Sequence, residues 1–114
     1  MQYLLLIYED EKRWAKPSQA EFDAEMAGYH AFGQEFGASI KGGNALQATM
    51  TAKTVRVRNG SSMVTDGPFA ETKEQLGGYY LVEAESQEQA LGMAGKIPGA
   101  RAGCVEVRPI MVFS

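Results

Sequence analysis

Tyr3-Leu4-Leu5-Leu6-Ile7-Tyr8, or YLLLIY, is the stretch that decides the fold. A continuous apolar and aromatic run of this length is typical of a central strand that is covered on both faces. No basic segment precedes the run and charged residues follow it at once, so a secretory signal peptide is a poor interpretation. We therefore expect a buried first strand, and the other elements are placed relative to it.

The size and charge of the chain limit its class. With 114 residues we expect a single domain spanning residues 1–114. The net charge is −3, and Lys and Arg are scattered, so the basic surface that nucleic acids require is missing. No apolar run approaches the roughly 20 residues that cross a bilayer, and the lone Cys104 cannot form an internal disulfide. These features predict a cytoplasmic protein that binds neither nucleic acid nor membrane.

A first helix is expected to begin at Ser18. Ser18 and Glu21 have the spacing of a capping box, in which each side chain binds a backbone N–H of the helix start. Gly37 is the expected C-terminal stop. Apolar residues recur every three or four positions and predict a face that packs on a sheet: Phe22, Met26, Tyr29, Phe32 and Phe36.

A β-hairpin is predicted over residues 54–65. Residues 54–58 alternate with period two, and Asn59-Gly60 supplies the positive-φ pair of a type I′ turn. This two-residue turn pairs Val55 with Val64 and Val57 with Ser62. Arg56 and Arg58 then lie on the other face, toward solvent.

The remaining elements complete the frame. Residues 39–46 contain Gly42-Gly43 and predict a short or bulged strand, and residues 77–84 predict a regular one. A second capping-box pattern starts a helix at Ser86, and Pro98-Gly99 is expected to end it. Residues 104–108 alternate as a last strand that extends toward residue 113. The apolar face expected for the second helix consists of Ala90, Leu91, Ala94 and Ile97.

The order of elements predicts an α+β fold of the ferredoxin-like βαββαβ type, with an extra β-hairpin between its halves. Two helices cover only one face of such a sheet. Dimerisation through the second face is a natural way to bury it, so we expect a homodimer.

The segment after the hairpin is the most distinctive in the chain. Asp66-Gly67-Pro68-Phe69, then Glu71-Thr72-Lys73-Glu74 and Gly77-Gly78-Tyr79, resemble the signature of the DGPF branch of the YCII-related family. The resemblance implies a dimeric α+β barrel and no established reaction. It also implies two associations of similar proteins: dehydrochlorination of an aromatic compound, and extracytoplasmic-function sigma factors.

Asp66 is the first catalytic candidate. A carboxylate at the lip of a sheet beside apolar Pro68 and Phe69 would be desolvated and suited to acid/base chemistry. The same residues are typical of a turn, in which Asp caps backbone N–H groups, Gly adopts a conformation that other residues avoid and Pro fixes its own φ. Both interpretations stay open.

His30 is the second candidate, because it is the only histidine, the residue type most often used as an acid/base group near neutral pH. The family resemblance implies a His and Asp pair with the His on the first helix, where His30 lies; a histidine without a role on the flank of the helix is the alternative. The expected substrate contacts are Pro68, Phe69, Tyr79, Tyr80 and Lys73. Tyr79 and Tyr80 point to opposite faces of one strand, so only one of them can line an enclosed site.

No metal or cofactor is expected, since one His and one Cys lack any ligand spacing and no phosphate-binding glycine motif is present. Three hypotheses follow. The chain is a small acid/base enzyme of elimination or isomerisation type acting on a hydrophobic or aromatic compound, a ligand-binding accessory dimer linked to sigma-factor signalling, or a stable dimer in which Asp66 only shapes a turn.

Overall fold

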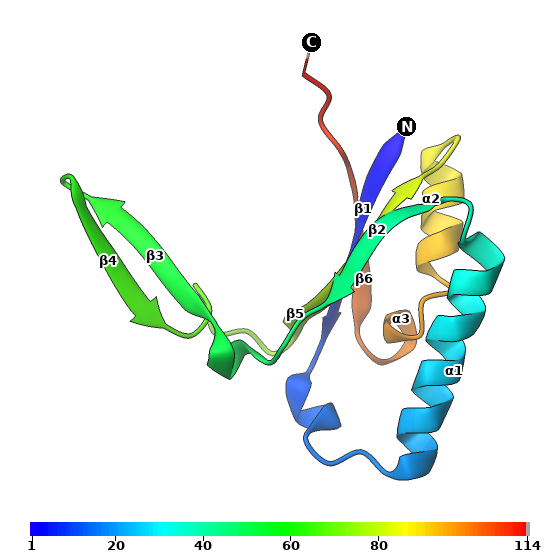
Figure 1. Cartoon of the computed structure of the whole chain (residues 1–114), viewed down its shortest axis with the longest axis horizontal. Coiled ribbons are helices and arrows are strands. Elements are labelled where there is room, and N and C mark those ends of the chain that lie inside the picture. Colours follow the sequence, from blue (N-terminus) through cyan, green and yellow to red (C-terminus); the bar gives the residue numbers. More distant parts are fainter. Residues whose placement is uncertain (114) are drawn as a thin grey trace.

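A computed structural model describes residues 1–113, in which helices and strands form one body and a projecting hairpin (Figure 1). Four strands form an antiparallel sheet in the order β2-β5-β1-β6, and two more form a separate β3-β4 sheet. The strands are β1 Gln2–Glu9, β2 Ile40–Ala45, β3 Lys53–Arg58, β4 Ser61–Asp66, β5 Gln75–Glu83 and β6 Cys104–Pro109. The helices are α1 Gln19–Phe36, α2 Gln87–Ala94 and α3 Gly99–Ala102, with short 3-10 turns η1 Glu11–Trp14 and η2 Thr49–Thr51. The predicted βαββαβ order is present, with β3 and β4 inserted between β2 and β5.

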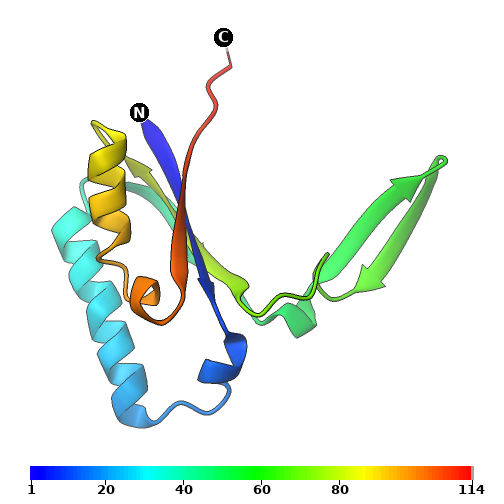
Figure 2. The same cartoon turned by 180° about the vertical axis from the view of Figure 1, so that it is seen from behind.

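The central strand β1 is buried on one face only. Tyr3, Leu5 and Ile7 face the helices and are almost inaccessible, whereas Leu4 and Leu6 on the opposite face are only half-buried. The expectation of a strand covered on both faces is therefore wrong for the chain described, because the helices all lie on one side of the sheet (Figures 1 and 2). Strand β1 is a central strand, as predicted, and its neighbours are β5 and β6.

Helix α1 begins and ends where the sequence predicts. Ser18 forms the full capping box with Glu21, and Gly37 is the C-cap. The apolar stripe is only partly buried: Phe32 belongs to the core, but Phe22 and Met26 are 49% and 53% exposed. The N-terminal end of α1 extends past the strands of the sheet (Figure 1).

The second half of the chain departs from prediction in detail. Ser86 caps α2, but this helix ends at Ala94, and Pro98-Gly99 begins α3 instead of ending α2. Ile97 is buried as expected, whereas Leu91 is 52% exposed because it faces away from the sheet. Strand β6 ends at Pro109 and does not reach residue 113.

The hairpin of β3 and β4, hereafter the arm, has the predicted type I′ geometry. Asn59 and Gly60 both have positive φ, 52° and 77°, and Val55 pairs with Val64. The arm stands away from the body, on the side of the sheet opposite the helices (Figures 1 and 2). Within residues 1–113, no helix is long and apolar enough to span a membrane.

Candidate functional site

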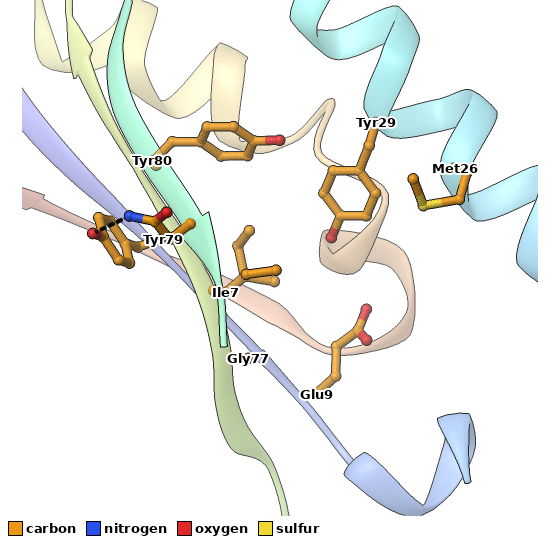
Figure 3. Close-up of a pocket in the computed structure, with 11 residues that line it drawn as sticks. Ile7, Glu9, Met26, Tyr29, Gly77, Tyr79 and Tyr80 are labelled. Carbon is orange, nitrogen blue, oxygen red and sulfur yellow. Dashed lines mark hydrogen bonds between the residues drawn. The ribbon is translucent and has the colours of Figure 1, made fainter. Parts of the chain in front are cut away.

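A hollow of about 390 Å³ lies between α1 and one end of the four-stranded sheet (Figure 3). Its walls come from β1, β2, β5 and α1, and most of its surface is apolar. The side chains that matter for its chemistry are Ile7, Glu9, Met26, Tyr29 and Tyr80. An apolar hollow with few polar groups is the usual form of a small-molecule site.

Glu9 places a carboxylate in this hollow. It is the last residue of β1 and lies on the strand face of Ile7, so the pleat turns it toward α1. Trp14 donates its indole N–H to Glu9 Oε2 at 2.7 Å, and Arg13 Nη1 lies 3.7 Å from Oε1. Oε1 itself is buried and accepts no hydrogen bond from the described residues. A buried acceptor without a donor is costly unless a ligand satisfies it.

Tyr29 brings a phenol to the same space from α1 (Figure 3). Burial raises the pKa of Tyr29 well above its ordinary value, and the negative charges of Glu9 and Glu25 raise it further. The pKa of Glu25, one helical turn earlier, is also raised, first by burial and then by the charge of Glu9. Tyr29 is therefore a neutral hydroxyl beside a carboxylate, and it can donate a hydrogen bond to a ligand.

Two glycines leave the space for this site. A Cβ at Gly99 would lie 2.6 Å from Ile7 Cγ2, 3.0 Å from Glu9 Oε1 and 3.3 Å from the Tyr29 hydroxyl. Glu9 and Tyr29 thus both lie against Gly99. A Cβ at Gly43 would lie 2.9 Å from Tyr80 Cδ1. Larger residues at either position would displace the walls of the hollow.

Asp66, Pro68 and Phe69 lie away from the hollow, at the end of β4 and in the loop that follows. The Asp66 side chain is 85% exposed and forms an ion pair with Lys53, so the expected desolvation beside Pro68 and Phe69 is wrong within one subunit. Phe69 is 79% exposed. Gly67 has φ 92°, which agrees with the turn interpretation of this segment.

The other predicted residues divide between the two faces of the sheet. Tyr80 points into the hollow and packs on Phe32, with ring centroids 4.9 Å apart. Tyr79 borders the hollow, but its side chain points to the opposite face, where its hydroxyl accepts a hydrogen bond from Asn44 Nδ2 (Figure 3). His30 and Lys73 are exposed. One subunit therefore does not bring His30, Lys73 and Asp66 together.

Glu9 is the functional candidate that the sequence interpretation missed. Its signal was the period of two in β1: Tyr3, Leu5 and Ile7 are buried, and the next residue of that series is Glu9. The sequence interpretation ended the strand run at Tyr8, one residue before Glu9. No group of three or more His, Cys, Asp or Glu in residues 1–113 is arranged to hold a metal ion.

Comparisons with known proteins agree with this architecture. A family model, the YCII-related domain, matches residues 1–114. An uncharacterised protein of Rhizobium meliloti is 37% identical over 117 residues, which cover 99% of this chain and 94% of that protein. The 5-chloro-2-hydroxyhydroquinone dehydrochlorinase of Burkholderia phenoliruptrix, solved in complex with 2,5-dihydroxybenzoquinone, has a similar structure with a TM-score of 0.59. It is 18% identical, the match covers 97% of this chain and 94% of that one, and the likeness shows the fold alone.

Proposed function

The chain belongs to the YCII-related family, and we propose that it catalyses proton transfer on a small, uncharged, hydroxylated aromatic compound, with Glu9 as the acid/base. The observation that carries this proposal is the Oε1 atom of Glu9, which is buried in an apolar hollow and accepts no hydrogen bond from residues 1–113. The Asp66 to Phe69 tetrapeptide supports a place in the DGPF branch of the family.

The residues around Glu9 have separate roles in ligand binding and in proton transfer. The indole of Trp14 holds Oε2, which leaves Oε1 free to accept a proton from a substrate hydroxyl. Tyr29 remains protonated and donates a hydrogen bond that orients a second oxygen of the ring. Ile7, Met26 and Tyr80 supply apolar contacts to the ring faces.

The proposed reaction is an elimination or an isomerisation. In an elimination, the Glu9 carboxylate takes the proton of a ring hydroxyl and the O–H electron pair forms a C=O bond. The protonated Glu9 returns this proton to the ring carbon that bears the leaving group. It then takes the proton of the opposite ring hydroxyl, whose O–H electron pair forms a second C=O bond while ring electrons expel the leaving anion with its bonding pair, and Glu9 finally releases that proton to solvent. In an isomerisation, the proton returns to a ring carbon. The name of the similar Burkholderia phenoliruptrix enzyme, a dehydrochlorinase, supports the elimination.

The charge of the site favours neutral substrates. Arg13 is the cation beside Glu9, and it already forms an ion pair with that carboxylate. An anionic ring bound next to Glu9 would bring a second negative charge into a poorly solvated hollow where Arg13 offsets only one. We therefore expect hydroquinones in their uncharged form to bind better than ionised quinones.

Binding can be tested through Trp14, which is the only tryptophan and gives a single indole N–H resonance. We expect hydroquinone to shift this resonance saturably. Glu9→Gln should weaken the binding by at least about tenfold, since the amide has one acceptor and one donor where the carboxylate has two acceptors. Glu88→Gln on the exposed surface of α2 is the control and should bind as the wild type does. Equal binding by Glu9→Gln and the wild type would refute the assignment.

Turnover can be tested with 5-chloro-2-hydroxyhydroquinone by measuring released chloride. We expect Glu9→Gln to lower kcat by about a hundredfold, the usual contribution of an acid/base group. The catalytic roles of Asp66 and His30 remain predictions, and Asp66→Asn and His30→Ala test them in the same assay. If these two variants lose turnover and Glu9→Gln keeps it, the acid/base residues are Asp66 and His30 and not Glu9.

A binding role without catalysis is the remaining prediction from the sequence, together with a sigma-factor-related partner. Saturable binding of hydroquinone without turnover of any hydroxylated aromatic compound would favour it. Binding that is lost in Glu9→Gln would still place the ligand in the same hollow.

A further inference from the structure

We propose that the substrate carries an apolar alkyl or aryl substituent on its hydroxylated ring, and that this substituent binds in a second hollow beside Glu9. The inference rests on the proposed function and deepens it, because it names the class of substrate. The second hollow has a volume of about 510 Å³. Its walls come from η1, from residues 46–50 between β2 and β3, and from the start of β5. The turns η1 and η2 lie at the same end of the sheet (Figure 1).

The two hollows meet at Glu9 and Gly77, which line both of them (Figure 3). Oε1 of Glu9 lies against Gly99 together with the Tyr29 hydroxyl, which belongs to the first hollow. Oε2 accepts the indole N–H of Trp14, which is a wall of the second hollow. A ligand whose hydroxylated ring lies beside Glu9 can therefore extend past Gly77 into the second hollow.

A β-bulge keeps the passage between the hollows open. The pairing of β5 with β1 shifts between Ile7 and Tyr8, which leaves Gly77 without a partner on β1. A Cβ at Gly77 would meet no heavy atom of residues 1–113 within 4 Å, whereas a Cβ at Gly78 would lie 3.1 Å from a main-chain oxygen of β2. The open space at Gly77 is the place where the hollows join, and a side chain there would narrow it.

The volume of the hollows favours a substrate that is longer than one ring. A cavity of about 150 Å³ is large enough to hold benzene. A single hydroxylated ring therefore fills less than half of the first hollow, whose volume is about 390 Å³, and does not reach the second. A ligand that extends into both hollows covers more apolar surface than hydroquinone does, and the removal of this surface from water favours binding.

The large side chains of the second hollow are apolar. Trp14, Leu46 and Met50 line it, together with the small residues Ala15 and Ala48. Leu46 and Met50 are 46% and 87% exposed, so each has apolar surface that a ligand can cover. Aromatic and aliphatic walls of this kind bind an apolar ring or chain by the same burial that stabilises a protein core.

The polar groups of the second hollow already have partners. At the root of the arm, Glu11 accepts hydrogen bonds from the Thr49 N–H and hydroxyl at 2.7 and 2.8 Å. The Glu11 N–H in turn donates to Gln75 Oε1 at 2.9 Å. The other polar residues of its walls, Lys12 and Gln47, are exposed, so their polar ends stay in water. A polar substituent would lose its hydration here without gaining an unpaired partner, which favours an apolar one.

Two compounds that differ by one apolar ring, hydroquinone and phenylhydroquinone, test the second hollow. Titrations followed by the Trp14 indole resonance give both dissociation constants. We expect phenylhydroquinone to bind the wild type about tenfold more tightly or better, because the added ring buries apolar surface. Nuclear Overhauser contacts between the phenyl protons and the Met50 methyl group should locate the added ring. Equal affinities for the two compounds would overturn the proposal.

Gly77→Val tests the passage between the hollows. The branched side chain suits a strand and meets open space at its Cβ, so the variant should fold, and its melting temperature checks this. The measured quantity is the ratio of the two dissociation constants, in which a loss common to both compounds cancels. Gly77→Val should bring this ratio close to one. Gly42→Val in β2 is the matched control and should keep the wild-type ratio, because Gly42 lines neither hollow and the nearest atom to its Cβ is 4.0 Å away.

The outcomes separate the second hollow from the proposed function. If Gly77→Val keeps the wild-type ratio, the phenyl ring binds elsewhere and the proposal is overturned. If hydroquinone binding depends on Glu9 but the phenyl group adds no affinity, the second hollow alone is refuted. If the phenyl group adds affinity that Gly77→Val removes, while Glu9→Gln binds both compounds as the wild type does, the second hollow is supported and the role of Glu9 is refuted.

Discussion

The four-stranded sheet and the arm are both antiparallel. The difference is what covers them: β1 has Tyr3, Leu5 and Ile7 buried beneath helices, whereas no side chain of the arm is buried within the subunit. The type I′ turn and the ladder specify the arm locally, but burial of apolar surface is the main source of stability. The body can therefore hold itself together, and the arm depends on what packs against it.

The largest predicted effect tests this contrast directly. Leu5→Ala should lower the free energy of unfolding by about 3 kcal/mol, because it leaves a cavity beneath α1 and α2 where Leu5 is fully inaccessible. Val57→Ala in the arm should cost less than about 0.5 kcal/mol at concentrations where the chain is monomeric. Denaturant unfolding measures both. Equal losses would show that the arm belongs to the folding unit of the single subunit.

The frame of the fold could be predicted because its signals are local. The capping box at Ser18 and the turn at Asn59-Gly60 depend on a few neighbouring residues, and the structure confirms both. The burial of Leu91 and the end of α2 depend on where the helix meets the sheet, which short-range patterns do not contain. For the same reason the sequence could not show that Phe22 and Met26 stay about half exposed.

The site was harder to predict than the fold. Asp66 is conspicuous in the sequence because turns use distinctive residues, yet its side chain is exposed in the subunit. Glu9 is inconspicuous, because it is a single carboxylate at the end of a strand. It is recognised only when the alternation of buried residues in that strand is extended to the next position of the series. Tyr79 and Tyr80 point to opposite faces of β5, as their adjacency in one strand predicts, and their roles as substrate contacts remain predictions.

The second effect concerns the space around Glu9. Gly99→Ala should destabilise the body by about 1–3 kcal/mol, because the new Cβ would approach Ile7 Cγ2 within 2.6 Å. Gly92→Ala is the matched control: this glycine lies inside α2 with open space at its Cβ, so alanine should stabilise the helix by about 0.5–1 kcal/mol. Thermal unfolding compares the two. If Gly99→Ala leaves the stability unchanged, Ile7 and Glu9 can move aside at little cost in free energy.

The third effect is smaller and acts at the junction between the two regions. Glu11→Ala removes the acceptor of the Thr49 N–H and hydroxyl and should cost about 1–2 kcal/mol. The effect that identifies this loss is hydrogen exchange that becomes faster for the amides of the arm than for those of β1. Glu71→Ala in the exposed loop before β5 is the control and should change neither. Unchanged exchange in the arm of Glu11→Ala would mean that this root does not set the arm's position.

The smallest effect is a pH dependence within the body, where two carboxylates of α1 should behave with opposite sign. Burial and the charge of Glu9 raise the pKa of Glu25, so its stabilising contribution is complete below its ordinary value of 4.5 and is lost as pH rises through the raised pKa. Hydrogen bonds with Ser18 lower the pKa of Glu21, so its contribution is present above 4.5 and is lost as pH falls through the lowered pKa. At pH 7, Glu25→Gln should therefore raise the melting temperature slightly and Glu21→Gln should lower it. Toward pH 4, the gain of Glu25→Gln should disappear. If the gain in melting temperature of Glu25→Gln does not depend on pH, the titration of Glu25 is not its cause. The electrostatic contact between Glu25 and Glu9 would then be excluded as well.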